Sequence, residues 1–313
     1  FCMLDTDQSA VWIKNPLAVY ADNSDSGVVI SGNKIIELVP LGSLPKADFD
    51  EVYDASNSVL LPGLINTHHH FYQTLTRAYP EALNKDLFPW LKSLYKVWAN
   101  IEPEMLAVST ELALSELLLS GCTTASDHHY LFPSQLENAI DIQVDKAQKL
   151  GMRVTLTRGS MSLGEKDGGL PPQSVVQTKQ DILLDSERLI KKYHDSKEGA
   201  MTQIALAPCS PFSVTKDLMI ETAGLAQQYD VRLHTHLAET IDEEKFCLEK
   251  FGLRTVDYLE SVGWLSNKTW LAHGIHFNKQ EIQKLGESGV GICHCPSSNM
   301  MLASGICHSL ELE

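Results

Sequence analysis

The sequence contains no apolar run of about 18 residues, the length that a membrane-spanning helix requires, so we expect no membrane span. Basic residues are scarce: 25 lysines and arginines stand against 40 aspartates and glutamates, which gives a formal net charge of −15. Such an acidic surface repels phosphates, so a nucleic acid polymer is not an expected partner. The first ten residues also lack the basic-then-apolar pattern of a signal peptide.

No two of the seven cysteines have the C-x-x-C spacing. An odd number of cysteines at irregular spacing in a chain of 313 residues is typical of reduced thiols and not of a disulfide framework. We therefore expect a cytoplasmic protein with free cysteines. Histidine, by contrast, is concentrated: all twelve lie from His68 onward, and most are found at the ends of apolar runs.

The N-terminal part reads as β-structure. Two apolar runs, Val28–Ile30 and Ile35–Val39, flank Ser31-Gly32-Asn33-Lys34, which is a hairpin signal. Another short strand is expected within Val52–Leu60. We predict a small β-sandwich module over residues 1–58, without visible chemistry of its own.

From residue 59 to residue 313, short apolar segments alternate with long amphipathic ones. This alternation predicts an α/β fold, a parallel (β/α)8 TIM-type barrel. No eighth strand is visible in this chain, so the predicted barrel over residues 59–313 is C-terminally incomplete. The expected strands are residues 59–66, 121–127, 153–158, 203–208, 231–237, 269–273 and 289–294.

One predicted helix has clear ends. It begins with Pro103 in its first turn and stops at Gly121, as the preferences of helix termini require. Apolar residues recur along it at helical spacing: Met105, Val108, Leu112 and Leu119.

Residues 84–100 are dense in aromatic side chains and follow the first barrel strand. Two interpretations are open: a lid over a flat heterocycle, or ordinary helix core. Helix core is the favoured interpretation for most of these side chains.

The segment Leu60–His70 ends in a His-x-His pair, His68 and His70. Side chains in a strand alternate between two faces, so these two imidazoles leave the backbone on the same side. Two neutral imidazoles on one face at a strand end form half of a metal site. Solvated loop histidines are the alternative, and the rest of the chain decides between the two.

Two later strands supply the missing partners. The fifth ends in His234-Thr235-His236, with Glu239 three residues further on, and the sixth ends in His273. Residues at the ends of several barrel strands converge on one point, so these groups are expected to meet the first pair.

Such a cluster has a definite chemistry. Three imidazoles hold a divalent metal ion and leave a position open for water. The metal lowers the pKa of that water from about 15.7 toward about 7. Glu239 is then placed to carry a proton to a leaving nitrogen, and His273 to orient the attacking oxygen. The predicted chemistry is hydrolysis at an electrophilic carbon.

Three ordered motifs carry a resemblance that covers essentially the whole chain. Pro-Gly-x-Ile-Asn-Thr-His-x-His, His-x-x-Glu and Ala-His-Gly, on successive barrel strands, resemble the amidohydrolase superfamily in its aminohydrolase (deaminase) branch. The resemblance implies a metal held by His68, His70 and His236. It also implies Glu239 as proton shuttle and His273 beside the metal.

By the same resemblance, His69 and His234 do not bind the metal. The favoured interpretation is that they pack against the ligands or form hydrogen bonds to them. The superfamily also requires an aspartate at the end of strand eight, as metal ligand and base for the attacking water. No aspartate follows His294. For this chain alone we therefore expect weakened metal binding and little turnover.

The loops point to a purine-like substrate. Gln73 follows the metal pair, as a similar glutamine does in guanine deaminases, and its amide can read a purine edge. Guanine deaminases also carry an arginine in the strand-four loop, but residues 207–212 of this chain contain none. Deaminases of the S-adenosylhomocysteine type carry a histidine at about the position of Cys209, which is also absent here. Arg158 is a candidate donor to a ring oxygen, with a surface ion pair as the alternative.

Taken together, these loops resemble those of 8-oxoguanine deaminases, which convert 8-oxoguanine to urate and ammonia. Met301, at a position commonly basic in related enzymes, departs from the pattern. One alternative is an aminohydrolase or dechlorinase of the same fold that acts on triazines or pterins. A second alternative is a non-catalytic binding protein with this fold. The expected cofactor is zinc, with iron as alternative; the expected partners are a small heterocyclic substrate and, by resemblance, a second copy in a homodimer.

Overall fold

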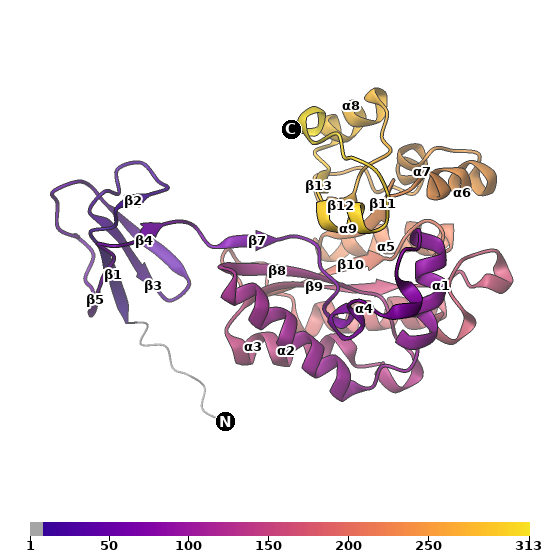
Figure 1. The fold of residues 1–313 in the computed structure, drawn as a ribbon, viewed down its shortest axis with the longest axis horizontal. Coiled ribbons are helices and arrows are strands. Elements are labelled where there is room, and N and C mark those ends of the chain that lie inside the picture. Colours follow the sequence, from indigo (N-terminus) through magenta and orange to yellow (C-terminus); the bar gives the residue numbers. More distant parts are fainter. Residues whose placement is uncertain (1–8) are drawn as a thin grey trace. The chain divides into compact units, whose positions relative to one another are not determined.

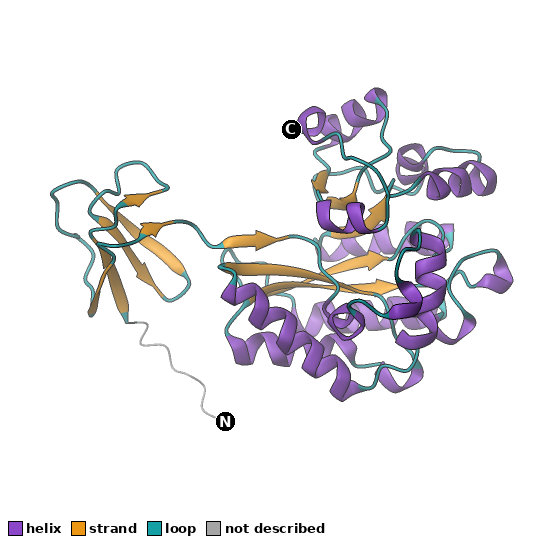
Figure 2. Cartoon of the chain, in the orientation of Figure 1, coloured by secondary structure: helices purple, strands orange, loops and turns teal. Residues whose placement is uncertain are grey.

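The computed structural model describes residues 9–313, which form two compact units (Figures 1 and 2). One unit comprises the residues up to Leu64 together with Lys197–Gly199, and the other comprises Ile65–Ser196 and Ala200–Glu313. Cys2 and nearly all of the segment searched for a signal peptide lie outside the described residues. The other six cysteines are free thiols, as predicted. No described helix has the length and hydrophobicity needed to span a bilayer.

The smaller unit is built from short strands. Its four-stranded sheet has the order β4-β3-β1-β5, and a separate parallel pair is formed by β2 and β6. The predicted hairpin is confirmed: β3 and β4 are antiparallel, and Ser31 pairs with Lys34 across a two-residue turn. The strands are β1 (Ala10–Lys14), β2 (Ala18–Val19), β3 (Gly27–Ser31), β4 (Lys34–Val39), β5 (Glu51–Asp54) and β6 (Val59–Leu60). A small core holds the sheet: Ala10, Trp12, Val29 and Val39.

The larger unit contains a seven-stranded sheet that curls, with its strands in the order of the sequence (Figure 1). From β8 to β13 each strand pairs in parallel with the next, so the β/α alternation read from the sequence is confirmed. The strands are β7 (Leu64–Asn66), β8 (Cys122–His129), β9 (Arg153–Ser160), β10 (Thr202–Pro208), β11 (Leu233–Leu237), β12 (Thr269–His273) and β13 (Gly291–Cys293).

The strand predicted over residues 59–66 is in fact two strands. Val59–Leu60 pairs with β2, and Leu64–Asn66 joins the large sheet. Pro62 lies between them and has no N–H to donate to a ladder, so a continuous strand cannot pass through it.

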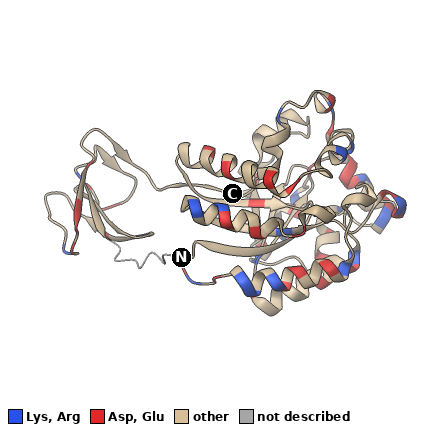
Figure 3. Cartoon of the chain, turned by 90° about the horizontal axis from the view of Figure 1, so that it is seen from below, with Lys and Arg blue, Asp and Glu red and all other residues tan. Residues whose placement is uncertain are grey.

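Helices follow the strands and cover the sheet. Helices α2 and α3 pack on β8 and β9, and α4 and α5 pack on β10. Figure 3 shows that the charged residues of the larger unit lie mainly along its helices. The α-helices are α1 (Leu87–Trp98), α2 (Pro103–Leu119), α3 (Ala139–Leu150), α4 (Lys179–Tyr193), α5 (Lys216–Tyr229), α6 (Ile241–Phe251), α7 (Thr255–Ser261), α8 (Lys279–Ser288), α9 (Pro296–Met301) and α10 (Ser309–Leu312). The 3-10 turns are η1 (Phe71–Thr76), η2 (Pro80–Ala82), η3 (Ser134–Leu136), η4 (Glu165–Asp167) and η5 (Gln173–Val175).

Helix α2 has the predicted ends but buries another face. The four apolar residues noted at helical spacing are all exposed, Leu119 to 89%. The face toward the core instead carries Leu106, Ala113 and Leu114 with two small hydroxyl residues. The helix is apolar on several sides, so periodicity alone could not choose the side that packs.

The aromatic segment is mainly helix core, the favoured interpretation. In α1 the side chains of Leu94, Tyr95 and Trp98 are fully buried. Trp90 is only half-buried and lines the main cavity together with Leu91.

Candidate active site

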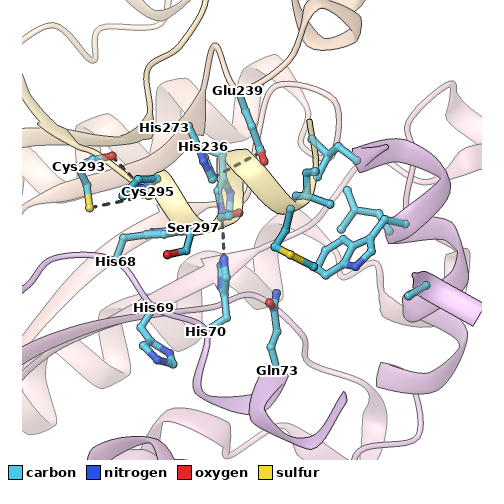
Figure 4. Close-up of a pocket in the computed structure, with 18 of the residues that line it drawn as sticks. His68, His69, His70, Gln73, His236, Glu239, His273, Cys293, Cys295 and Ser297 are labelled. Atoms are coloured by element: carbon cyan, nitrogen blue, oxygen red, sulfur yellow. Dashed lines mark hydrogen bonds and ion pairs between the residues drawn. The ribbon is translucent and has the colours of Figure 1, made fainter. Parts of the chain in front are cut away.

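A cavity of about 800 Å³ lies at the carboxyl ends of the parallel strands. This is the edge at which strand-end residues of barrel proteins converge. The close-up in Figure 4 shows that the labelled groups come from the segment between β7 and η1, from η1, from the ends of β11, β12 and β13, and from the start of α9. Among its lining residues are seven of the eight predicted site residues: His68, His70, Gln73, Cys209, His236, Glu239 and His273.

His70 and His236 face each other through their Nε2 atoms, 3.2 Å apart (Figure 4). His70 Nδ1 lies 2.7 Å from the carbonyl of His128, and His236 Nδ1 lies 2.6 Å from that of Cys209. A carbonyl only accepts, so both Nδ1 atoms carry the proton and both Nε2 atoms present lone pairs. Two ligands of one tetrahedral zinc, each at about 2.0–2.1 Å, lie about 3.3 Å apart. The pair therefore fits a shared metal ion.

His68 presents its Nε2 atom by the same logic. His234 Nδ1 donates to the carbonyl of Trp270 at 2.8 Å, so His234 Nε2 is an acceptor. His68 Nδ1 lies 2.7 Å from that atom and donates to it, which leaves His68 Nε2 with a lone pair. His234 thus supports His68 from behind, the arrangement in which a second imidazole fixes the tautomer of a metal ligand.

The rings of His68, His70 and His236 are close to one another. The ring of His68 stands edge-on to those of His70 and His236, with centroids 4.7 and 4.9 Å away. Two sets of ligand atoms within 4.8 Å of one another contain His68, one with His128 and His236, the other with His273 and Cys295. Neither set includes His70, whose Nε2 atom lies 3.2 Å from that of His236.

Burial keeps these imidazoles neutral. It lowers the pKa of His70 to about 3 and holds those of His68 and His236 well below the ordinary value, with mutual repulsion adding to the effect. Neutral imidazole is the form that binds metal, so the site needs no deprotonation to receive an ion at neutral pH.

Glu239 and His273 form the second half of the site. A carboxylate oxygen of Glu239 lies 3.5 Å from His273 Nε2 (Figure 4). His273 Nδ1 donates to the side-chain oxygen of Asn299 at 3.0 Å, so its Nε2 is an acceptor. Burial raises the pKa of Glu239 to about 8 and lowers that of His273 to about 4. Burial therefore favours the neutral carboxyl group of Glu239 and the neutral imidazole of His273 at this contact.

Gln73 and Cys209 reach the cavity, but they contribute differently. Gln73 extends from η1 toward the histidines (Figure 4). Burial raises the pKa of the Cys209 thiol to about 12, so the side chain remains a neutral thiol. Its backbone carbonyl, which accepts from His236, fixes the orientation of that imidazole.

Arg158 requires a correction. It is buried outside the cavity, and its Nε donates to Asp185 of α4 at 2.7 Å. One Nη atom donates to the carbonyl of Gly159 and the other to Gln177, and the guanidinium lies over the ring of Phe132. Arg158 points to the helix side of β9, so the structure supports the alternative of an ion pair, here a buried one, and gives no support to a substrate contact.

Two residues near the site, Tyr130 and Asn299, were not assigned to it from the sequence, and for His128 the sequence left a role behind the ligands and a loop role equally open. Tyr130 lines the cavity edge-on to His70, and Asn299 orients His273. His128 stacks on His236 with centroids 4.6 Å apart, and its Nδ1 has no partner among the described residues. Their sequence positions, within or just after β8 for His128 and Tyr130 and within α9 for Asn299, do not show which side chains turn inward.

Comparison with known proteins places the chain in a family. The model of the amidohydrolase family matches residues 59–312. The chain belongs to the amidohydrolase family. It is 63% identical over 308 residues to 8-oxoguanine deaminase of Pseudomonas aeruginosa, covering 97% of this chain and 69% of that protein. The family resemblance read from the three motifs is thereby confirmed.

Two further relatives of this amidohydrolase act on triazines, as their names state. Hydroxydechloroatrazine ethylaminohydrolase of a Pseudomonas species is 34% identical over 82% of the chain, which spans only 53% of that protein. The structure of atrazine chlorohydrolase from Arthrobacter aurescens, complexed with zinc, superposes with a TM-score of 0.88 at 28% identity, over 97% of this chain and 69% of that one.

Proposed function

We propose that this amidohydrolase is a metal-dependent hydrolytic deaminase of an oxidised purine, converting 8-oxoguanine and water to urate and ammonia. The observation that carries the proposal is the pair of facing Nε2 atoms of His70 and His236, in the same cavity as the buried carboxyl group of Glu239, which lies 3.5 Å from His273. The 63% identity to an 8-oxoguanine deaminase supports the choice of substrate.

In the proposed site His68, His70 and His236 hold a divalent metal, and their supporting hydrogen bonds fix the rings. When bound, the metal supplies Lewis acidity that brings the pKa of water near 7. Zinc is proposed, since a zinc-bound structure is similar over nearly the whole chain; iron is the alternative.

The protein's own groups then move the protons. The oxygen of water bonds to the ring carbon that bears the amine, and the carbon–nitrogen bond breaks. Glu239 delivers its proton to the departing nitrogen and recovers one from the attacking water, since it is buried and lines the cavity. His273, held by Asn299, presents an acceptor nitrogen to Glu239 and to the attacking oxygen.

The finer architecture and setting are proposals as well. We propose that the curled seven-stranded sheet belongs to a closed (β/α)8 barrel, in which an eighth strand pairs with both β13 and β7. A homodimer and a cytoplasmic location are proposed from the family resemblance and the free thiols.

The test combines elemental analysis of the purified protein with ammonia release from 8-oxoguanine on the same sample. About one zinc or iron per chain together with ammonia release supports the proposal. A metal-containing protein that releases no ammonia from 8-oxoguanine, but releases ammonia, alkylamine or chloride from pterins or triazines, is the result expected of a pterin or triazine hydrolase. The relatives that act on triazines support this second candidate. Absence of both metal and turnover in the full-length protein contradicts catalysis and favours a binding protein.

A further inference from the structure

The turn that carries Glu239 has an unfavourable backbone. Ala238, between the end of β11 and Glu239, has φ of 52°, in the left-handed region that side chains other than glycine rarely adopt. Ala238 is also fully buried. A conformation of this kind persists only where neighbouring groups hold it in place.

The group that holds the turn is the carboxylate of Glu243, in the first turn of α6. One oxygen accepts the N–H of Ala238 at 3.0 Å, and the other accepts the N–H of Glu239 at 2.9 Å. Glu243 is fully buried and, among the described residues, takes part in no ion pair. Burial raises the pKa of Glu243 to about 8, but the two backbone donors and the helix N-terminus favour its carboxylate form, in which both oxygens accept.

The same turn is tied to the element that carries His273. The carbonyl of Ala238 accepts the N–H groups of Ile275 and His276, at 2.9 and 3.0 Å. The N–H of Gly274, next to His273, donates to the carbonyl of Leu237 at 3.1 Å. Both backbone groups of Ala238 are therefore engaged, one by Glu243 and one by the chain just beyond His273.

We propose that Glu243 is a positioning residue for the proton-transfer step: by fixing both amides of the Ala238–Glu239 turn, it sets the 3.5 Å approach of the Glu239 carboxyl to His273. Glu243 does not line the cavity, so it acts through Glu239 and touches no substrate. This inference rests on the proposed deaminase function.

The chain offers a matched control in the adjacent residue. Glu244 is also a buried glutamate of α6, but its carboxylate forms an ion pair with Arg254 and does not reach the turn. In E243Q the amide group would place N–H against N–H at one of the two bonds, so the turn should relax. In E244Q the turn bonds stay intact.

The first experiment compares wild type, E243Q and E244Q in metal-loaded full-length protein. For E243Q we expect kcat to fall about 10- to 100-fold, the order expected when a catalytic group is misplaced by about 1 Å. KM and metal per chain should change less than about twofold, because the three histidines and the cavity wall are untouched. E244Q should keep the kcat of wild type even if its melting temperature falls.

A double-mutant cycle separates positioning from a general loss of structure. Because Glu243 acts through Glu239, adding E243Q to E239Q should cost less than about twofold in kcat beyond E239Q alone. A multiplicative loss in E239Q/E243Q, or an E243Q variant as active as wild type, overturns the inference and leaves the deaminase function standing. Wild-type protein that turns over neither purines, pterins nor triazines overturns both.

Discussion

His234 and His236 lie two residues apart on β11, point to the same side and are both buried, yet they do different things. His236 Nε2 meets His70 Nε2 as one lone pair facing another, whereas His234 Nε2 receives a proton from His68. The difference comes from depth. His236 is nearer the carboxyl end of the strand, where a metal and water have access, and His234 lies below that level. Equal spacing and equal residue type therefore do not imply equal function.

The largest effect on turnover is expected when His236, the outer histidine of β11, is replaced. H236N removes one of the two facing nitrogens, and we expect loss of bound metal and a fall in kcat of about a thousandfold or more, because the metal supplies several kcal/mol of stabilisation. Elemental analysis and ammonia release measure both. Full metal content in H236N would show that the outer histidine is not a ligand.

Loss of His234, the inner histidine of β11, should have a smaller effect on turnover and should appear mainly as weaker metal affinity. H234F keeps the volume of the ring but leaves His68 Nδ1 without its acceptor. We expect metal affinity, measured by competition with a chelator, to fall about 10- to 100-fold, as for other groups that orient a ligand. With saturating metal, kcat should return to within a few-fold of wild type. Loss of kcat that excess metal cannot restore would assign His234 a direct role and erase the contrast with His236.

Arg158 extends the comparison to a strand-end residue that faces the helices. R158M removes the ion pair with Asp185, and the free energy of unfolding should fall by about 1–3 kcal/mol, because the Gly159 carbonyl and Gln177 lose a donor while Asp185 keeps Arg188. Activity per folded molecule and KM should stay near wild type. Denaturant unfolding and substrate titration check the two parts, and a selective rise in KM would reinstate Arg158 as a substrate contact.

The smallest effect on turnover is expected at Asp127, a buried residue of β8 that lies outside the cavity. It accepts bonds from the Phe71 N–H and from Gln143, yet burial raises its pKa to about 7. When folding raises the pKa of a carboxyl group, its stabilising contribution to the free energy of unfolding is complete below the unfolded pKa near 4. That contribution is lost as pH rises through the folded pKa of about 7.

The contribution of Asp127 should therefore decline between pH 4 and pH 8, so the stability of D127N, which stays neutral, should gain on that of wild type as pH rises across this range. Urea unfolding across this range gives both slopes. The Gln143 amide can turn to present its unpartnered oxygen to the new Asn side chain, so D127N should fold. Parallel slopes for the two proteins would mean that Asp127 is ionised in the folded state throughout.

Much of the fold and the site could be predicted because both depend on local patterns. Strand positions followed from short apolar runs, and the strands from β8 to β13 appear where they were expected. The site followed from strand order: residues at successive strand ends share one edge of a parallel sheet, so His68, His236 and His273 could be grouped across 200 residues of sequence. That grouping needed no knowledge of side-chain packing.

The sequence by itself determined the family, the parallel sheet and the histidines and glutamate that meet at the cavity, since these follow from periodicity, order and motif. Only the tertiary structure decided which side of α2 is buried, that Arg158 turns to Asp185, and that Glu243 holds the turn beneath Glu239. Each of those outcomes depends on which partner a side chain meets. A partner from a distant segment is fixed by packing and leaves no periodic signal in the chain.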